Sequence, residues 1–137
     1  MESDSILSER ALREIYLKGF EICVKEAKPC AVMSSYNLLN GVHTSERRDL
    51  AEDILRCEWG FDGVVMTDWY STNPGQGSNA SCMAAGNDLI MPGGFYYKQE
   101  ILAALATGKI TKAQLRRCCG NVIKATLESN VQKQFIG

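Results

Sequence analysis

The sequence has 137 residues, of which 45% are hydrophobic and 23% are charged, and its formal net charge is −1. This length suits one domain with a core of its own, and the scattered charges exclude the basic stripe of a nucleic-acid surface. No apolar run is long enough to cross a bilayer. We therefore expect residues 1–137 to form a single domain without a nucleic-acid or membrane partner, and residues 131–137 to be a flexible tail.

The first half of the sequence predicts two helices and two strands. A helix begins after Ser8, carries an apolar residue at every third or fourth position and ends at Pro29. A short apolar strand, Cys30 to Met33, follows it, and Asn40-Gly41 marks a turn. A second helix begins near Thr44 or Ser45, and Gly63 to Thr67 has the composition of a buried strand.

The second half predicts a loop, a third strand and three helices. A short helix over about 80–85 precedes the strand Asp88 to Met91. A helix over about 97–106 ends at Gly108, and Thr111 with Gln114 forms a capping box for the last helix. Short apolar strands that alternate with helices indicate a parallel sheet with right-handed crossovers. The fold class is therefore α/β, either a small open sheet or a part of a (β/α)8 barrel.

The six cysteines do not indicate a disulfide framework or a metal site. The sequence has no C-x-x-C pair and only one histidine, so a Cys/His metal site is not expected, and no cofactor is either. We expect the cysteines to be reduced thiols, most of them in the core, which favours a reducing compartment such as the cytoplasm.

The residues that could take part in a reaction follow the ends of the predicted strands. In parallel α/β folds the active site lies at the carboxyl ends of the strands, and here Tyr36, Asp68 and Trp69 follow two of them. A carboxylate beside an indole suits sugar chemistry, since the carboxylate can attack an anomeric carbon and the indole can stack on a sugar ring. The alternative is that Asp68 caps a turn and that Trp69 belongs to the core.

Five segments in order resemble the barrel domain of glycoside hydrolase family 3, of the β-glucosidase type. The resemblance covers about residues 8–128 and implies the C-terminal part of a (β/α)8 TIM barrel, with about three of its parallel strands. The segments are Leu12 to Leu17, Met33 to Asn37 with Asn40-Gly41-Val42, Ile54 to Arg56 with Glu58 to Phe61, Gly63 to Trp69, and Ala85 to Gly93.

The same resemblance implies the roles of four residues. Asp68 would be the nucleophile of a retaining mechanism, attacking the anomeric carbon of a terminal β-linked sugar to give a covalent glycosyl-enzyme. Tyr36 would donate a hydrogen bond that keeps this carboxylate ionised, and Trp69 and Met33 would line the pocket of the first sugar ring. Asp88, at the opposite end of its strand, is expected to be structural.

The general acid/base of the family lies outside the matching segment, so we expect the isolated chain to be inactive. Three strands of a barrel also leave open edges, and we expect them to be completed by self-association into a homo-oligomer. A non-catalytic carbohydrate-binding or structural α/β module is the main alternative. A phosphorelay receiver is disfavoured because this sequence lacks the acidic pair that such a site needs. A nucleotide site on the loop Pro74 to Gly77 is disfavoured because the loop lacks the glycine spacing and the lysine of such sites.

Overall fold

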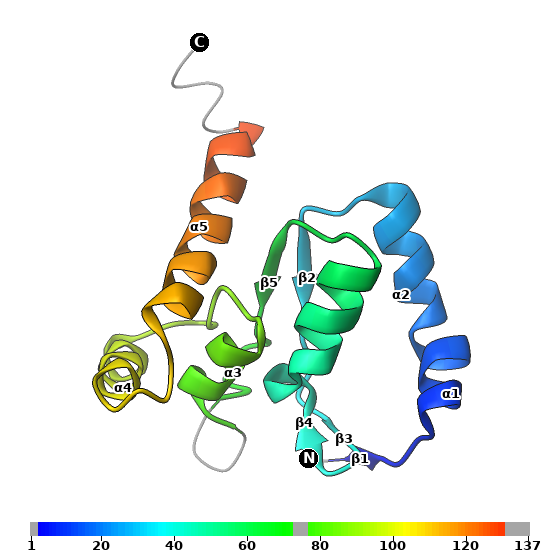
Figure 1. The fold of residues 1–137 in the computed structure, drawn as a ribbon, viewed down its shortest axis with the longest axis horizontal. Helices are drawn as coiled ribbons and strands as arrows, with labels where there is room; N and C mark the ends of the chain where they lie inside the picture. The colour runs from blue at the N-terminus through cyan, green and yellow to red at the C-terminus, as the bar shows by residue number, and fades with distance from the viewer. Residues whose placement is uncertain (1–2, 73–76, 131–137) are drawn as a thin grey trace.

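The computed structural model describes residues 3–72 and 77–130 as an α/β arrangement around a two-stranded parallel sheet (Figure 1). Strand β2 (Ala31–Met33) pairs with β5 (Val64–Met66), with Val32 opposite Val65. The predicted tail 131–137 and most of the loop Pro74 to Gly77 lie outside the described residues. Among the described residues, no helix is long and apolar enough to cross a membrane.

The N-terminal helix forms where the apolar spacing predicts it. It comprises α1 (Glu9–Ala11), η1 (Leu12–Tyr16), α2 (Lys18–Ile22) and η2 (Cys23–Ala27), with α-helical and π-helical turns in alternation. Ser8 caps it by accepting a hydrogen bond from the Ala11 amide. The second helix begins later than predicted, since a separate 3-10 turn, η3 (Thr44–Glu46), precedes η4 (Asp49–Glu58).

A small second sheet was not predicted from the sequence. It consists of β1 (Asp4–Ser5), β3 (Leu38–Leu39) and β4 (Val42–His43), with β3 parallel to β1 and antiparallel to β4. The predicted Asn40-Gly41 turn joins β3 to β4, and both residues have positive φ angles. Two-residue strands are too short to show a period in the sequence, which is why periodicity missed them.

The predicted third strand is reduced to one parallel bridge between Met66 and Leu89. Helices α3 (Asn79–Ala85), α4 (Phe95–Ala106) and α5 (Lys112–Glu128) form close to their predicted positions, and the Thr111–Gln114 capping box is present. Figure 1 shows α5 on one side of the sheet and η4 with the N-terminal helix on the other. The arrangement is consistent with part of a barrel.

Two clusters of buried side chains make up the core. One joins the N-terminal helix and η4 to strand β5 through Val24, Leu55, Phe61 and Val65. The other joins α3, α4 and α5 to the residues that follow the Met66–Leu89 bridge, and its buried members are Ala80, Cys82, Met83, Ile90, Ala104, Ile110 and Cys118. The strand that carries Asp68 therefore lies between two separately packed groups of helices.

Several residues predicted to be in the core are exposed instead. Of the six free cysteines only Cys82 and Cys118 are buried, so the prediction that most of them lie in the core was wrong. Ile15 on the N-terminal helix is 68% exposed and Ile123 on α5 is 58% exposed. Each lies on a helix face that no described residue covers, although the spacing that predicted a buried face is present in the sequence.

Candidate active site

The residues predicted for the site gather at the carboxyl edge of the β2–β5 sheet. Tyr36 follows β2, and Asp68 and Trp69 follow β5, which is the arrangement that parallel pairing of the two strands requires. Ser34 and Met66 join the two segments, because the Ser34 amide donates to the Met66 carbonyl at 2.8 Å. The loops after both strands therefore leave the sheet side by side.

Tyr36 spans the gap between the two loops. Its hydroxyl donates a hydrogen bond to the backbone carbonyl of Trp69. Loss of hydration is the largest cause of a raised Tyr36 pKa, and the negative charge of Asp68 and a side-chain hydrogen bond with it raise this pKa further. Tyr36 thus lies against both Asp68 and Trp69. Its role in keeping Asp68 ionised stays a prediction.

Asp68 is partly buried and is held by its own loop. Its Oδ1 accepts the amide of Trp69 at 2.6 Å, while its carbonyl accepts the hydroxyl of Ser71 at 3.0 Å. Tyr70 has a φ of +63° and donates its amide to the Met91 carbonyl at 3.1 Å, which ties this loop to the residues that follow the Met66–Leu89 bridge.

Trp69 and Met33 offer apolar surface beside this carboxylate. Trp69 is 42% exposed and Met33 is 52% exposed, and Tyr36 is exposed to a similar degree at 40%. An exposed indole next to a carboxylate gives a sugar ring both a stacking surface and a reactive group. The structure brings Tyr36, Asp68 and Trp69 together, and Met33 ends the neighbouring strand.

A large apolar cleft lies elsewhere in the described part of the chain. It has a volume of about 530 Å³ and separates the N-terminal helix from β2 and η4, and its lining is mostly apolar. Of the four predicted site residues it includes only Met33. Among the described residues no three His, Cys, Asp or Glu side chains gather as a metal site. The cleft includes neither Asp68 nor Trp69, so the carboxyl edge of the sheet is the candidate site.

Two acidic residues, neither of them predicted to be catalytic, hold Ser78 at the start of helix α3. Glu46 accepts the amide of Ser78 at 2.7 Å. Glu100 on α4 accepts the Ser78 hydroxyl at 3.0 Å and the side-chain amide of Asn79. Glu100 was not anticipated, since only the fold brings α4 to the start of α3.

Comparison with known proteins identifies the family of this chain. The family model described as "Glycosyl hydrolase family 3 N terminal domain" matches residues 4–125. The chain belongs to glycoside hydrolase family 3. A beta-glucosidase of Ruminococcus albus is 40% identical over 142 aligned residues, which cover 98% of this chain and 15% of that protein. An exo-alpha-(1->6)-L-arabinopyranosidase of Bifidobacterium longum is 44% identical, over 88% of this chain and 15% of that protein.

Solved structures give the same family and the same fold. Beta-glucosidase 3B from Thermotoga neapolitana, in complex with alpha-D-glucose, matches 96% of this family 3 chain and 19% of its own chain. The TM-score is 0.88 and the sequence identity is 44%. The chain thus spans only about 15% of the length of the curated relatives that it matches.

Proposed function

We propose that this chain supplies the nucleophile side of a retaining β-glucosidase site, with Asp68 as the nucleophile. The observation that carries the proposal is the position of Asp68 at the carboxyl end of β5, beside Tyr36 and Trp69. Family membership supports it, since relatives of this chain are named as beta-glucosidases. Glucose is accordingly the first sugar to test, and the arabinopyranosidase relative makes arabinopyranosides the second.

The proposed chemistry is a double displacement. A carboxylate oxygen of Asp68 attacks the anomeric carbon, a new carbon–oxygen bond forms, and the glycosidic bond breaks with departure of the aglycone alcohol. Water then attacks the same carbon and releases the sugar and the free carboxylate. Trp69 and Met33 would hold the sugar ring, and Tyr36 would donate to the carboxylate when it is charged.

The second carboxyl group of the mechanism is proposed to come from outside this chain. Retaining enzymes place the acid/base about 5–5.5 Å from the nucleophile, on the other side of the scissile bond. Glu46 and Glu100 are already engaged with Ser78, so neither is proposed as this group. The isolated chain is accordingly proposed to form no product from an unactivated glucoside.

The test of the nucleophile uses 2-deoxy-2-fluoro-β-D-glucosyl fluoride, whose leaving group departs as fluoride ion without needing a general acid. Incubation with the chain should add one fluoroglucosyl group, found by intact mass measurement and placed on Asp68 by peptide mapping. An Asp68→Asn chain should add none. An adduct on another carboxylate, or an equal yield with Asp68→Asn, would contradict the proposal. Glucose binding with no adduct would favour a carbohydrate-binding module.

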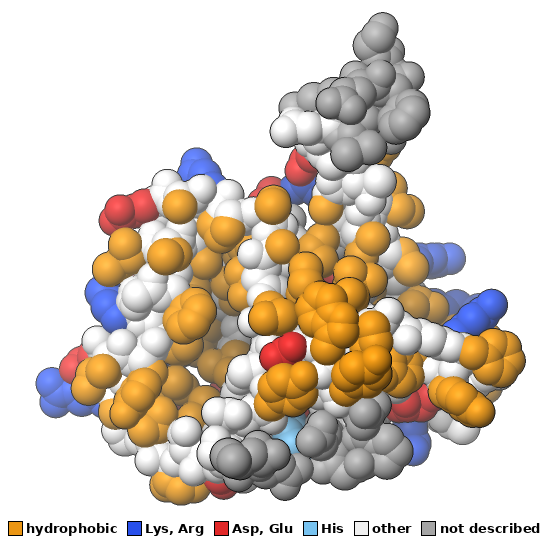
Figure 2. Space-filling view, turned by 180° about the vertical axis from the view of Figure 1, so that it is seen from behind, with side chains coloured by type: hydrophobic (Ala, Val, Ile, Leu, Met, Phe, Trp, Pro, Cys, Tyr) orange, Lys and Arg blue, Asp and Glu red, His pale blue; other side chains and the backbone are white. Residues whose placement is uncertain are grey.

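We also infer that the isolated chain self-associates. One edge of β2 is unpaired among the described residues, and the apolar cleft beside it lies open to solvent. Figure 2 shows hydrophobic side chains gathered across one face of the molecule. Surface of this extent on a soluble chain is normally covered by another element.

The expected result of self-association is a molar mass above that of the 15.1 kDa monomer, measured by light scattering, and rising with concentration. The physical reason is that Phe20, 58% exposed on the N-terminal helix, and Leu127, 56% exposed on α5, become buried only between copies. Phe20→Glu together with Leu127→Glu should shift the mass toward the monomer. A compact monomer for the unchanged chain at high concentration would contradict the inference.

A further inference from the structure

The strand that carries Asp68 lacks most of its regular hydrogen-bond ladder on one side. Toward residues 88–91 only the rungs around the Met66–Leu89 bridge are regular, with the Thr67 amide donating to the Leu89 carbonyl at 3.0 Å. A parallel ladder would continue with evenly spaced backbone bonds in both directions. Here a side chain replaces the backbone on each side of the bridge.

The first replacement lies on the Asp68 side of the bridge. The Met91 amide donates to the hydroxyl of Thr67 at 2.9 Å, in place of a backbone carbonyl. Thr67 is fully buried, so this hydroxyl is not exchanged for water. The rung fixes the residue that directly precedes Asp68.

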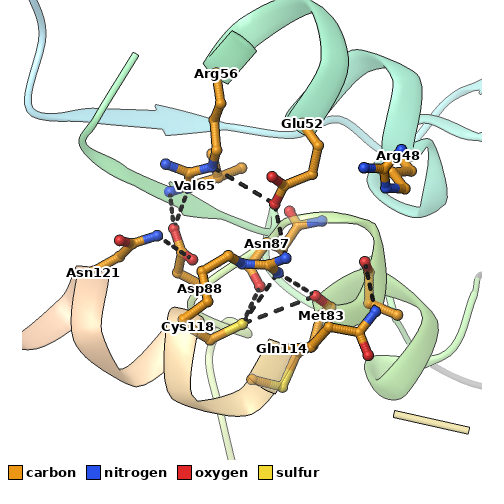
Figure 3. Close-up of polar contacts among 12 residues, drawn as sticks. Arg48, Glu52, Arg56, Val65, Met83, Asn87, Asp88, Gln114, Cys118 and Asn121 are labelled. Atoms are coloured by element: carbon orange, nitrogen blue, oxygen red, sulfur yellow. Dashed lines mark hydrogen bonds and ion pairs between the residues drawn. The ribbon is translucent and has the colours of Figure 1, made fainter. Parts of the chain in front are cut away.

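The second replacement lies on the opposite side and comes from Asp88. Its Oδ2 accepts the backbone amide of Val65 at 2.9 Å and the guanidinium of Arg56 at 2.6 Å, while its Oδ1 accepts the side-chain amide of Asn121 at 2.9 Å. The Asp88 side chain is fully buried. Figure 3 shows these donors converging on one carboxylate from β5, η4 and α5.

Arg56 links this carboxylate to the start of the same strand. It is 12% exposed at its side chain, and it donates to the Gly63 carbonyl at 3.0 Å as well as to Asp88. One arginine–carboxylate pair thus holds the strand at two backbone atoms, the Gly63 oxygen and the Val65 nitrogen. Hydrogen bonds between charged groups are shorter and stronger than neutral ones, and burial shields this pair from water.

We propose that Asp88, supported by Arg56, is a positioning residue for the reaction proposed above. Its carboxylate replaces a rung of the ladder and so fixes the register of β5, which sets where Asp68 leaves the sheet. The inference rests on the proposed function only in that β5 carries the nucleophile. Register matters here because a shift by one residue would turn every side chain of β5 to the other face, and so would move the point from which the chain continues to Asp68.

Amide hydrogen exchange of the chain tests this inference directly. Asp88→Ala removes the acceptor of the Val65 amide, so exchange at Val65 and Thr67 should become at least about tenfold faster, relative to the amide of Ala51 in η4. Asp88→Asn keeps one neutral oxygen for Val65, so its exchange should rise only about threefold. A uniform rise at all three amides in these variants would overturn the inference and leave Asp88 a general stabiliser of the fold.

Asn121→Ala is the matched control, since it removes a donor from the other oxygen of the same carboxylate and leaves the Val65 bond in place. It should leave exchange at Val65 unchanged relative to Ala51. If circular dichroism shows that Asp88→Ala is unfolded, the Asp88→Asn chain decides. In that case the inference would be overturned if Asp88→Asn accelerated exchange at Val65 no more than it accelerated exchange at Ala51.

A second readout follows the site itself. The charge of Asp68 contributes to the raised pKa of Tyr36, so a strand released from its register should bring this pKa down toward its ordinary value of about 10. Selective labelling of tyrosine and a pH titration by NMR measure it. An unchanged Tyr36 pKa in a folded Asp88→Ala chain would overturn the inference. Neither readout needs a sugar to react. The positioning role of Asp88 can therefore fail while Asp68 is the nucleophile, and Asp68 can fail as the nucleophile while Asp88 still positions the strand.

Discussion

Asp68→Asn should abolish hydrolysis in a protein in which this chain replaces the matching segment of Thermotoga neapolitana beta-glucosidase 3B. The two are 44% identical over 96% of this chain, so the replacement segment should fit its host. Loss of a nucleophile typically lowers kcat by on the order of 10⁴- to 10⁶-fold, because the covalent intermediate no longer forms. Initial rates with an aryl β-glucoside, and then an aryl arabinopyranoside, measure the effect.

A matched control separates this loss from a general effect of removing a carboxylate. Asp53→Asn makes the same chemical change in η4, where Asp53 forms an exposed ion pair with Arg48. Exposed pairs of this kind contribute little to stability, so its rate should stay within about twofold of the unchanged protein. Activity of the Asp68→Asn protein within tenfold of the unchanged protein would contradict the assignment.

The role of Asp68 can also be separated from that of an acid/base. In an Asp68→Ala protein, azide can enter the space of the missing carboxylate and attack the anomeric carbon of an aryl glucoside in its place. One displacement in place of two inverts the centre, so the product should be the α-glucosyl azide. Formation of the β-azide would show that a sugar–enzyme intermediate still forms and that Asp68 is the acid/base or a bystander.

The sequence was sufficient for the parts of the fold that depend on local spacing. Apolar runs and the Thr111–Gln114 capping box placed most of the helices and both strands of the main sheet. The position of Asp68 at the end of a strand followed from the run Gly63 to Thr67 alone. These signals are readable because helices and buried strands repeat their apolar residues over a few positions.

The parts that the sequence did not reveal depend on partners far along the chain. Asp88 reads as a polar residue before a strand, and only the fold shows that its carboxylate replaces a backbone rung for Val65. The third strand was overpredicted for the same reason, since apolar residues 89–91 have a strand's composition while side chains take their ladder bonds. Helix α5 shows the opposite case: its apolar spacing predicts a buried face, but Ile123 on that face is exposed and no described residue covers it.

Gly63→Ala should be the most destabilising single-methyl change in the strand that carries Asp68. A Cβ at this position would overlap the carbonyl oxygen of Cys30 and would lie 2.8 Å from both the Cys30 carbonyl carbon and the Phe61 ring. The Cys30 oxygen cannot move away freely, because it accepts the Val64 amide at 3.0 Å in the first rung between the two strands. Overpacking against fixed atoms costs about 3 kcal/mol.

The measurement is thermal unfolding, in which a loss of about 3 kcal/mol lowers the melting temperature by roughly 10 °C for a chain of this size. Gly120→Ala is the matched control, since Gly120 lies in α5 and a Cβ there would meet no atom within 4 Å. Alanine is the better helix former by about 1 kcal/mol, so this variant should melt higher. The same added methyl group would then have opposite effects at two glycines. If both variants melted alike, the close approach of β5 to Cys30 would not be what requires glycine at position 63, and the tight packing of the two strands beneath Asp68 would have to be revised.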